Sequence, residues 1–131
     1  MKYFIIAGEA SGDLHASNLM KGIRKSDPNA GFRFLGGDLM KEVSPDGLQY
    51  HYSHMNFMGL FAVLANLRFL SKILKNTKRE ILAYEPDAVI LVDYAGFNLR
   101  MAKFVSKAGI KVFYYISPKV WAWKKSRIKS L

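Results

Sequence analysis

The sequence predicts an α/β fold with an open, parallel, twisted sheet and helices on both faces. Short apolar runs alternate with segments of helical periodicity along the chain. One of these runs, at residues 88–92, is continuously apolar, which is typical of a central parallel strand. Half of the 131 residues are hydrophobic, enough for one domain with its own core. We therefore expect a single Rossmann-like domain across residues 1–131.

Each predicted element rests on its periodicity and on the glycine or proline that bounds it. The apolar run at residues 2–7 ends at glycine and is too short for a signal peptide. The segment 55–79 has helical periodicity but polar interruptions, so it falls short of the ~20 apolar residues of a membrane span. In chain order we expect strand 2–7, helix 14–25, strand 32–35, helix 39–43, strand 48–52, helix 55–79, strand 88–92, helix 97–107 and strand 111–116.

The formal net charge of +10 indicates an anionic partner. The candidates are nucleic acid, an anionic membrane surface and a phosphorylated substrate, and no acidic residue follows Asp93. A nucleic-acid platform would interleave aromatic and basic residues, and the apolar segment 55–79 argues against it. The chain has no cysteine, which excludes a disulfide framework and a thiolate metal site and fits the reducing cytoplasm.

Three loops should lie at the carboxyl ends of the strands, where open α/β sheets bind ligands. In the first loop, Gly8 and Gly12 let the chain turn sharply, and a helix starting near Asp13 offers free N–H groups to an anion or a sugar. Alternatively, Ser11 or Asp13 merely caps that helix. The spacing differs from Gly-x-Gly-x-x-Gly, which disfavours a nicotinamide cofactor. Two titratable residues that could face the same cleft are Glu9 and His15.

The second loop begins at Asp93, directly after the central strand. A partly desolvated carboxylate holds a proton more readily, which suits a general base, although Asp93 could instead cap the next helix. Asn98 is expected to orient a neighbour or a sugar hydroxyl. The histidines at positions 51 and 54 have no convincing third ligand, so we interpret them as surface or packing residues and expect no metal.

The third loop carries two tryptophans between a Ser-Pro turn and a basic cluster. Trp121 and Trp123 either pack beneath the sheet edge or contact a sugar or an acyl chain. Lys124 and Arg127 would share a helical face and pair with phosphate. Ser117 shapes the turn rather than acting as a nucleophile, since no triad partners are evident.

The motifs of these loops resemble those of the lipid-A-disaccharide synthases. The matching segments are Ala-Gly-Glu-Ala-Ser-Gly-Asp at 7–13, Val-Asp-Tyr-Ala-Gly-Phe-Asn at 92–98 and Ser-Pro-Lys-Val-Trp-Ala-Trp at 117–123, with weaker matches at 36–40 and 57–60. They occur in the right order along nearly the whole chain. One departure is Gly96, where the family often has a second aspartate, so no role of that carboxylate is transferred.

The resemblance implies the amino-terminal, acceptor-side half of a two-domain GT-B glycosyltransferase, inactive without its carboxyl-terminal nucleotide-sugar domain. The family joins UDP-2,3-diacylglucosamine to the 6-hydroxyl of 2,3-diacylglucosamine 1-phosphate, giving the β-1,6 disaccharide 1-phosphate and UDP in lipid A biosynthesis. The reaction inverts the anomeric centre and is expected to need no cofactor. Catalytic roles fall to Asp93 and Glu9. The expected substrate contacts are Gly8, Ser11, Gly12, Asp13, His15, Met58, Phe61, Asn98, Ser117, Trp121, Trp123, Lys124 and Arg127.

The segment 55–79 has two interpretations. It is either a surface helix with a solvated basic face, or a basic amphipathic helix at an anionic membrane. We expect a mixed role, with Phe57 and Phe69 as further acyl-chain contacts and the enzyme in the cytoplasm, peripheral to the inner membrane. The competing functions are a non-catalytic lipid-binding module and a related UDP-sugar transferase of cell-envelope precursors, from which the Trp-Ala-Trp segment separates it.

Overall fold

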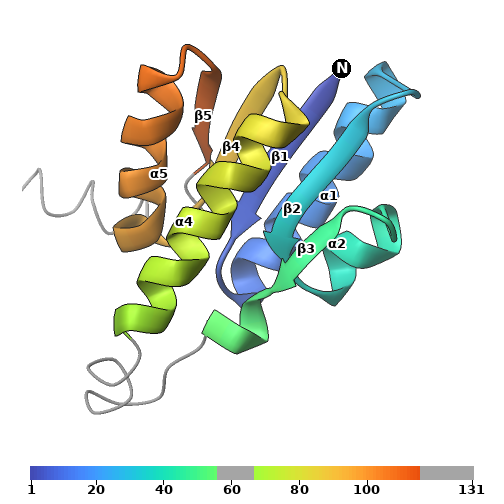
Figure 1. Ribbon diagram of the computed structural model, residues 1–131. Coiled ribbons are helices and arrows are strands. Elements are labelled where there is room, and N and C mark those ends of the chain that lie inside the picture. Colours follow the sequence, from blue (N-terminus) through green and yellow to red (C-terminus); the bar gives the residue numbers. More distant parts are fainter. Residues whose placement is uncertain (56–66, 116–131) are drawn as a thin grey trace, which may run out of the picture.

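A parallel five-stranded sheet organises the domain (Figure 1). The computed structural model describes residues 1–55 and 67–115. The strand order is β3-β2-β1-β4-β5, and every neighbouring pair is parallel. The strands are β1 (Lys2–Ala7), β2 (Gly31–Gly36), β3 (Leu48–His51), β4 (Ala88–Val92) and β5 (Lys111–Tyr115).

Helices cover both faces of this sheet, as Figure 1 shows. One core joins α1 and α2 to one face, and the other core joins α4 and α5 to the opposite face. The strands divide their side chains between the two cores by simple alternation, so that in β1 Ile5 faces α1 while Phe4 and Ile6 face the other helices. The helices are α1 (Ala10–Ser26), α2 (Asp38–Val43), the 3-10 turn η1 (Tyr52–Met55), α4 (Leu67–Tyr84) and α5 (Ala95–Lys107).

The predicted fold class is confirmed, and β4 occupies the predicted residues 88–92, with every residue buried. A strand between two helical layers must be apolar on both sides, which explains its continuous run of Ala, Val, Ile and Leu. None of the described helices is long and apolar enough to cross a membrane.

Several predicted helix boundaries are wrong. The first helix begins at Ala10 rather than near Asp13, because Glu9 is extended and its carbonyl oxygen already accepts the first helical hydrogen bond. The helix expected to end at Arg79 continues to Tyr84, and there Glu85 adopts a left-handed φ of 51° before a proline. Likewise α5 begins at Ala95 rather than at residue 97. The predicted helical residues 56–66 lie outside the described part of the chain.

Candidate active site

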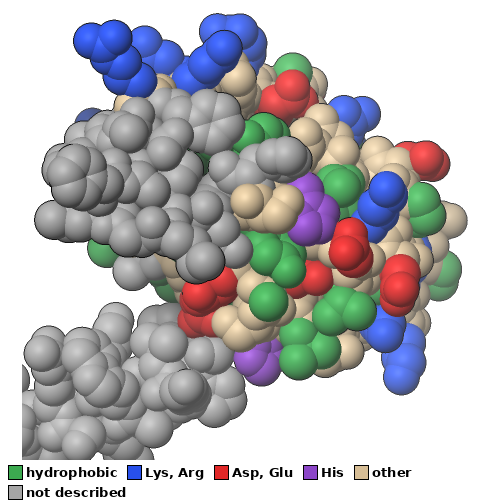
Figure 2. Space-filling view, turned by 90° about the horizontal axis from the view of Figure 1, so that it is seen from below, with side chains coloured by type: hydrophobic (Ala, Val, Ile, Leu, Met, Phe, Trp, Pro, Cys, Tyr) green, Lys and Arg blue, Asp and Glu red, His purple; other side chains and the backbone are tan. Residues whose placement is uncertain are grey.

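The carboxyl ends of the parallel strands meet at one edge of the sheet, which Figure 2 views face on. Acidic side chains are spread over this face from its middle to its margin, and histidines lie both near the middle and at the lower margin, whereas lysines and arginines gather mostly at the periphery. Two of the three predicted loops start at this edge within the described residues, after β1 and after β4. The third follows β5 and lies outside them.

Asp93 occupies a strained elbow between β4 and α5. Both Asp93 and Tyr94 have φ of 47°, a left-handed conformation that costs on the order of 1–3 kcal/mol per non-glycine residue. The surrounding hydrogen bonds hold this conformation. The Asp93 amide donates to the Tyr115 carbonyl at 3.0 Å, and the Asp93 carbonyl accepts from Asn98 Nδ2 at 2.8 Å and Tyr114 Oη at 2.9 Å. Hydrogen bonds therefore hold the Asp93 backbone at both its N–H group and its carbonyl oxygen.

Asp93 lies where the hydrophobic core meets the carboxyl-end edge of the sheet. The residue is buried, with 6% of its surface exposed. Burial and, to a smaller degree, the negative charge of Asp93 raise the pKa of Tyr114. The Asp93 carboxylate therefore lies near the Tyr114 hydroxyl, and this hydroxyl stays protonated near neutral pH.

Asn98 lies in the interior, where it joins the first and fourth strands. It has no exposed surface, and its Nδ2 donates to the carbonyls of Asp93 at 2.8 Å, Val92 at 3.3 Å and Ile6 at 3.5 Å. Its Oδ1 is buried and has no hydrogen-bond partner within the described region. Of the two roles predicted for Asn98, these contacts are those of a residue that orients a neighbour.

Gly8 and Glu9 form the loop that faces the Asp93 elbow. Glu9 is exposed and extended, and it occupies the N-cap position of α1 without a side-chain cap hydrogen bond. Burial and, second, the charge of Glu9 raise the pKa of Tyr94, so this carboxylate lies near the Tyr94 hydroxyl. The sequence prediction missed Tyr94, although it directly follows Asp93 in the 92–98 motif.

Gly12 draws the start of α1 against the sheet. A Cβ at this position would lie 3.3 Å from the Ala7 Cβ and 3.7 Å from Val92 Cγ1. The close packing brings the first loop next to the end of β4, so the evident role of Gly12 is steric. On the same helix Ser11 is exposed, while His15 is half-buried with its ring centroid 6.0 Å from that of Tyr115.

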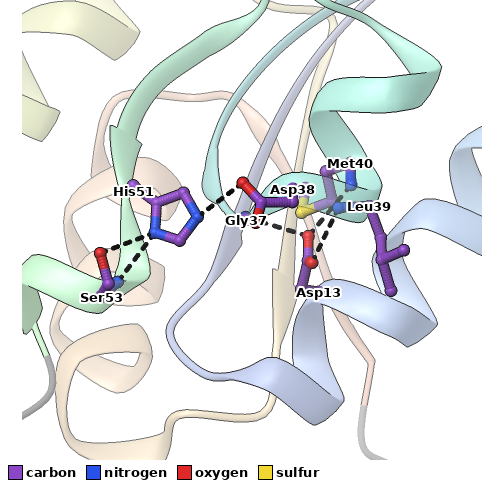
Figure 3. A network of polar contacts seen from close by, with 7 residues as sticks. All are labelled: Asp13, Gly37, Asp38, Leu39, Met40, His51 and Ser53. Atoms are coloured by element: carbon purple, nitrogen blue, oxygen red, sulfur yellow. Dashed lines mark hydrogen bonds and ion pairs between the residues drawn. The ribbon is translucent and has the colours of Figure 1, made fainter.

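Asp13 caps a helix, but not the one that contains it (Figure 3). Its carboxylate accepts hydrogen bonds from the amides of Gly37 at 2.9 Å, Leu39 at 3.0 Å and Met40 at 3.1 Å, all at the start of α2. Since Asp13 lies inside α1, the expectation that it caps its own helix is wrong. With 3% exposure and these three bonds, its geometry is that of a structural clamp and gives no support to a substrate contact.

His51 joins a second polar network at the same edge (Figure 3). Its Nε2 lies 3.1 Å from Asp38 Oδ1, and its Nδ1 lies 2.9 Å from Ser53 Oγ and accepts the Ser53 amide at 3.1 Å. An Nδ1 that accepts an amide leaves the proton on Nε2, which then donates to Asp38. Among the described residues, no group of three or more His, Cys, Asp or Glu could hold a metal ion.

The remaining predicted contacts lie outside the described residues, and their roles stay predictions. They are Met58, Phe61, Ser117, Trp121, Trp123, Lys124 and Arg127, together with Phe57 and the side chain of Phe69. The side chain of His54, predicted as a surface or packing residue, also lies outside the described part of the structure.

Comparisons with known proteins agree with the resemblance in the motifs. Residues 3–131 match the sequence model of the lipid-A-disaccharide synthetase family. A lipid-A-disaccharide synthase of Geobacter metallireducens is 43% identical over 99% of this chain and 34% of its own length. Those of Syntrophus aciditrophicus and Coxiella burnetii are 42% and 39% identical, each over 97% of this chain and 33% and 34% of their lengths. The chain thus spans about a third of these curated relatives.

A solved structure supports the fold independently. The UDP-GlcNAc 2-epimerase of Neisseria meningitidis superposes with a TM-score of 0.58 over 87% of this chain and 32% of the epimerase. The sequence identity is 12%, so this likeness concerns the fold alone.

Proposed function

Because this chain belongs to the lipid-A-disaccharide synthetase family, we propose that it is the acceptor-side domain of an inverting glycosyltransferase. The donor is UDP-2,3-diacylglucosamine and the acceptor is 2,3-diacylglucosamine 1-phosphate. The products are the β-1,6-linked disaccharide 1-phosphate and UDP. The nucleotide-sugar domain belongs to the two thirds of the relatives' length that this chain does not span.

The observation that carries this proposal is the Asp93 elbow at the carboxyl end of β4, a strand between β1 and β5 in the sheet. A base for glycosyl transfer must accept a proton from the acceptor hydroxyl at the moment the oxygen attacks. Asp93 offers a carboxylate on a backbone that hydrogen bonds fix at two atoms, so its position costs little reorganisation during the reaction.

The proposed step is a single displacement. The 6-hydroxyl oxygen of the acceptor attacks the anomeric carbon of the donor, and its proton passes to Asp93. The bond between that carbon and the UDP oxygen breaks, and its electron pair leaves with the diphosphate. Attack from the opposite face inverts the anomeric configuration and requires no covalent intermediate on the enzyme.

Glu9 is the second carboxylate that we place at this edge. It is exposed and lies near the Tyr94 hydroxyl, on the loop packed against the Asp93 elbow. We propose that Glu9 binds acceptor hydroxyls and that Asp93 takes the proton. His15, half-buried further along α1, borders the same site.

We further propose that the domain docks on the cytoplasmic surface of an anionic membrane through α4 and α5. These helices lie side by side on one face of the sheet (Figure 1) and carry eight basic residues against one acidic residue, Glu80. Each Lys or Arg near an anionic membrane surface contributes about 1 kcal/mol to the free energy of membrane binding. The basic residues are Arg68, Lys72, Lys75, Lys78, Arg79, Arg100, Lys103 and Lys107.

Spacing along the helices supports this docking face. Arg68, Lys72, Lys75 and Arg79 recur at intervals of three or four, so they form one exposed stripe on α4. Vesicle co-sedimentation tests the idea with Lys72→Glu/Lys75→Glu against Lys21→Glu/Lys25→Glu on α1. The first pair should abolish binding to vesicles containing phosphatidylglycerol, whereas the control pair should retain it. Equal loss in both pairs would contradict a docking face on α4 and α5.

A transfer assay tests the proposed reaction. The protein that carries this domain together with the remaining two thirds of the relatives' length is incubated with the two acylated glucosamine substrates. We expect disaccharide phosphate and UDP in equal amounts, and no transfer by residues 1–131 alone. Acceptor binding without any product would instead favour the non-catalytic lipid-binding module, and turnover only with another UDP-sugar would favour the related transferase.

A further inference from the structure

Tyr94 covers Gly8 so closely that no side chain fits between them. A Cβ built on Gly8 would lie 2.4 Å from both Cγ and Cδ1 of the Tyr94 ring and 2.7 Å from Cδ2. Real Cβ atoms do not approach other atoms so closely. The ring therefore lies flat against the backbone of the loop that follows β1.

The conformation of Gly8 does not itself require glycine. Among the described glycines, only Gly109 has a positive φ, so an alanine at position 8 meets no backbone penalty. The steric conflict with the Tyr94 ring is what excludes a side chain. A ligand-approach role for Gly8, as the sequence suggested, must compete with this ring for the same space.

Several contacts fix the Tyr94 ring in this position. Its backbone adopts the left-handed φ of 47° at the N-cap of α5, and its ring centroid lies 5.8 Å from that of Phe97 one turn into the helix. The residue is half-buried, and its hydroxyl lies near Glu9. Movement of the ring would thus disturb both the elbow and the first loop.

We propose that Tyr94 is a positioning residue, an inference that rests on the proposed function. Through its contact with Gly8, the Tyr94 ring holds the Glu9 loop against the Asp93 elbow, and we call this contact the clamp. The two carboxylates lie in loops that follow different strands, β1 and β4, and each directly adjoins one half of the clamp. Because the ring bridges the two loops, the spacing between Glu9 and Asp93 depends on it. The clamp therefore sets the geometry in which an acceptor hydroxyl meets both groups.

A set of four variants with one control isolates this contact. Gly8→Ala displaces the ring, Tyr94→Ala removes it, and Tyr94→Phe retains the ring without the hydroxyl. The double variant Gly8→Ala/Tyr94→Ala shows whether the damage from alanine at position 8 acts through the ring. The control is Gly22→Ala in α1, where an added Cβ meets nothing within 4 Å.

Amide hydrogen exchange measures the clamp without any reference to activity. The Asp93 amide, bonded to the Tyr115 carbonyl, should exchange about tenfold faster in Gly8→Ala and in Tyr94→Ala. The double variant should exchange no faster than Tyr94→Ala alone. Tyr94→Phe and Gly22→Ala should match the parent. Unchanged exchange in Gly8→Ala, or a further increase in the double variant, would overturn the clamp.

Transfer kinetics then test the positioning role in the longer protein that contains this domain. Below the melting temperature of every variant, Gly8→Ala should lower kcat by about ten- to a hundredfold with little change in KM, because misplaced groups slow the reaction more than binding. Parent-like kcat in Gly8→Ala would overturn the role even if exchange had changed. An inactive parent would refute the proposed function instead, while the exchange measurement would still decide on the clamp.

Discussion

Replacing Asp13 with alanine should destabilise the domain without touching the chemistry. The carboxylate accepts three amide hydrogen bonds, and those from Gly37 and Met40 are buried. A buried donor that loses its partner costs about 1–3 kcal/mol, and loss of a helix cap costs about 1 kcal/mol. Water can reach the part-buried Leu39 amide. The expected loss of unfolding free energy is therefore about 3 kcal/mol.

Denaturant unfolding and thermal melting measure this loss. For a domain of this size, 3 kcal/mol corresponds to a decrease in Tm of about 12 °C. Asp13→Asn keeps one acceptor oxygen and should lose about 1 kcal/mol, chiefly because its amide group opposes the Leu39 N–H. The matched control is Asp46→Ala, since Asp46 is exposed in the turn after α2, and it should change the stability by less than about 0.5 kcal/mol.

The alternative for Asp13 is a substrate contact. In that case Asp13→Ala would lower activity while the melting temperature stayed within a few degrees of the parent. A loss below about 1 kcal/mol relative to Asp46→Ala would refute the clamp on α2.

Four further substitutions probe the scaffold of the site. Tyr114→Phe should cost about 1 kcal/mol at neutral pH through the lost bond to the Asp93 carbonyl. Burial, with a smaller effect of the Asp93 charge, raises the Tyr114 pKa above 10.0, so the stability that its proton provides is present below pH 10 and lost as the pH rises through the raised pKa. Tyr114→Phe should accordingly flatten the alkaline decline in denaturant titrations, and an unchanged decline would exclude this group as its source. Asn98→Ala should cost about 2–3 kcal/mol in urea unfolding, because the buried carbonyls of Val92 and Asp93 lose a donor, while the Asp93 carbonyl keeps the bond from Tyr114. A loss near zero would contradict that role. Gly96→Ala should raise the stability by about 0.5–1 kcal/mol, since open space surrounds that position in α5. Gly37→Ala should instead lower the Tm, because its Cβ would lie 2.3 Å from the Tyr52 ring. Equal shifts in Tm for the two variants would show that these contacts do not decide the outcome.

The sequence predicted the strands better than the helices because strands between two helical layers have an unambiguous pattern. The apolar run that became β4 ends at a charged residue, and Asp93 could be placed at the carboxyl end of that strand from this alone. The start of α1 was missed because Ser11 and Gly12 have low helix propensity and read as loop. Packing of Gly12 against Ala7 and Val92 overrides that propensity.

The long-range contacts of the site were beyond the sequence for a different reason. Asp13 accepts hydrogen bonds from amides that lie 24 to 27 positions further along the chain, and the Tyr94 ring packs on Gly8 in the loop that follows β1. Periodicity reports which face of an element is buried but not which residue it meets there. The motif around Asp93 did contain Tyr94, so the residue could have been marked, but its stacking on Gly8 could not.

The most direct test of the central claim is the transfer rate of Asp93→Asn, measured in the longer protein that carries this domain. Asparagine preserves the size of the side chain and the backbone bonds of the elbow but cannot accept the proton. We expect a loss in kcat of about a hundredfold or more, with unchanged Tm and with Asp46→Asn as active as the parent. A variant nearly as active as the parent would contradict the assignment of Asp93 as the general base and would leave Glu9 or His15 as the candidates for that role.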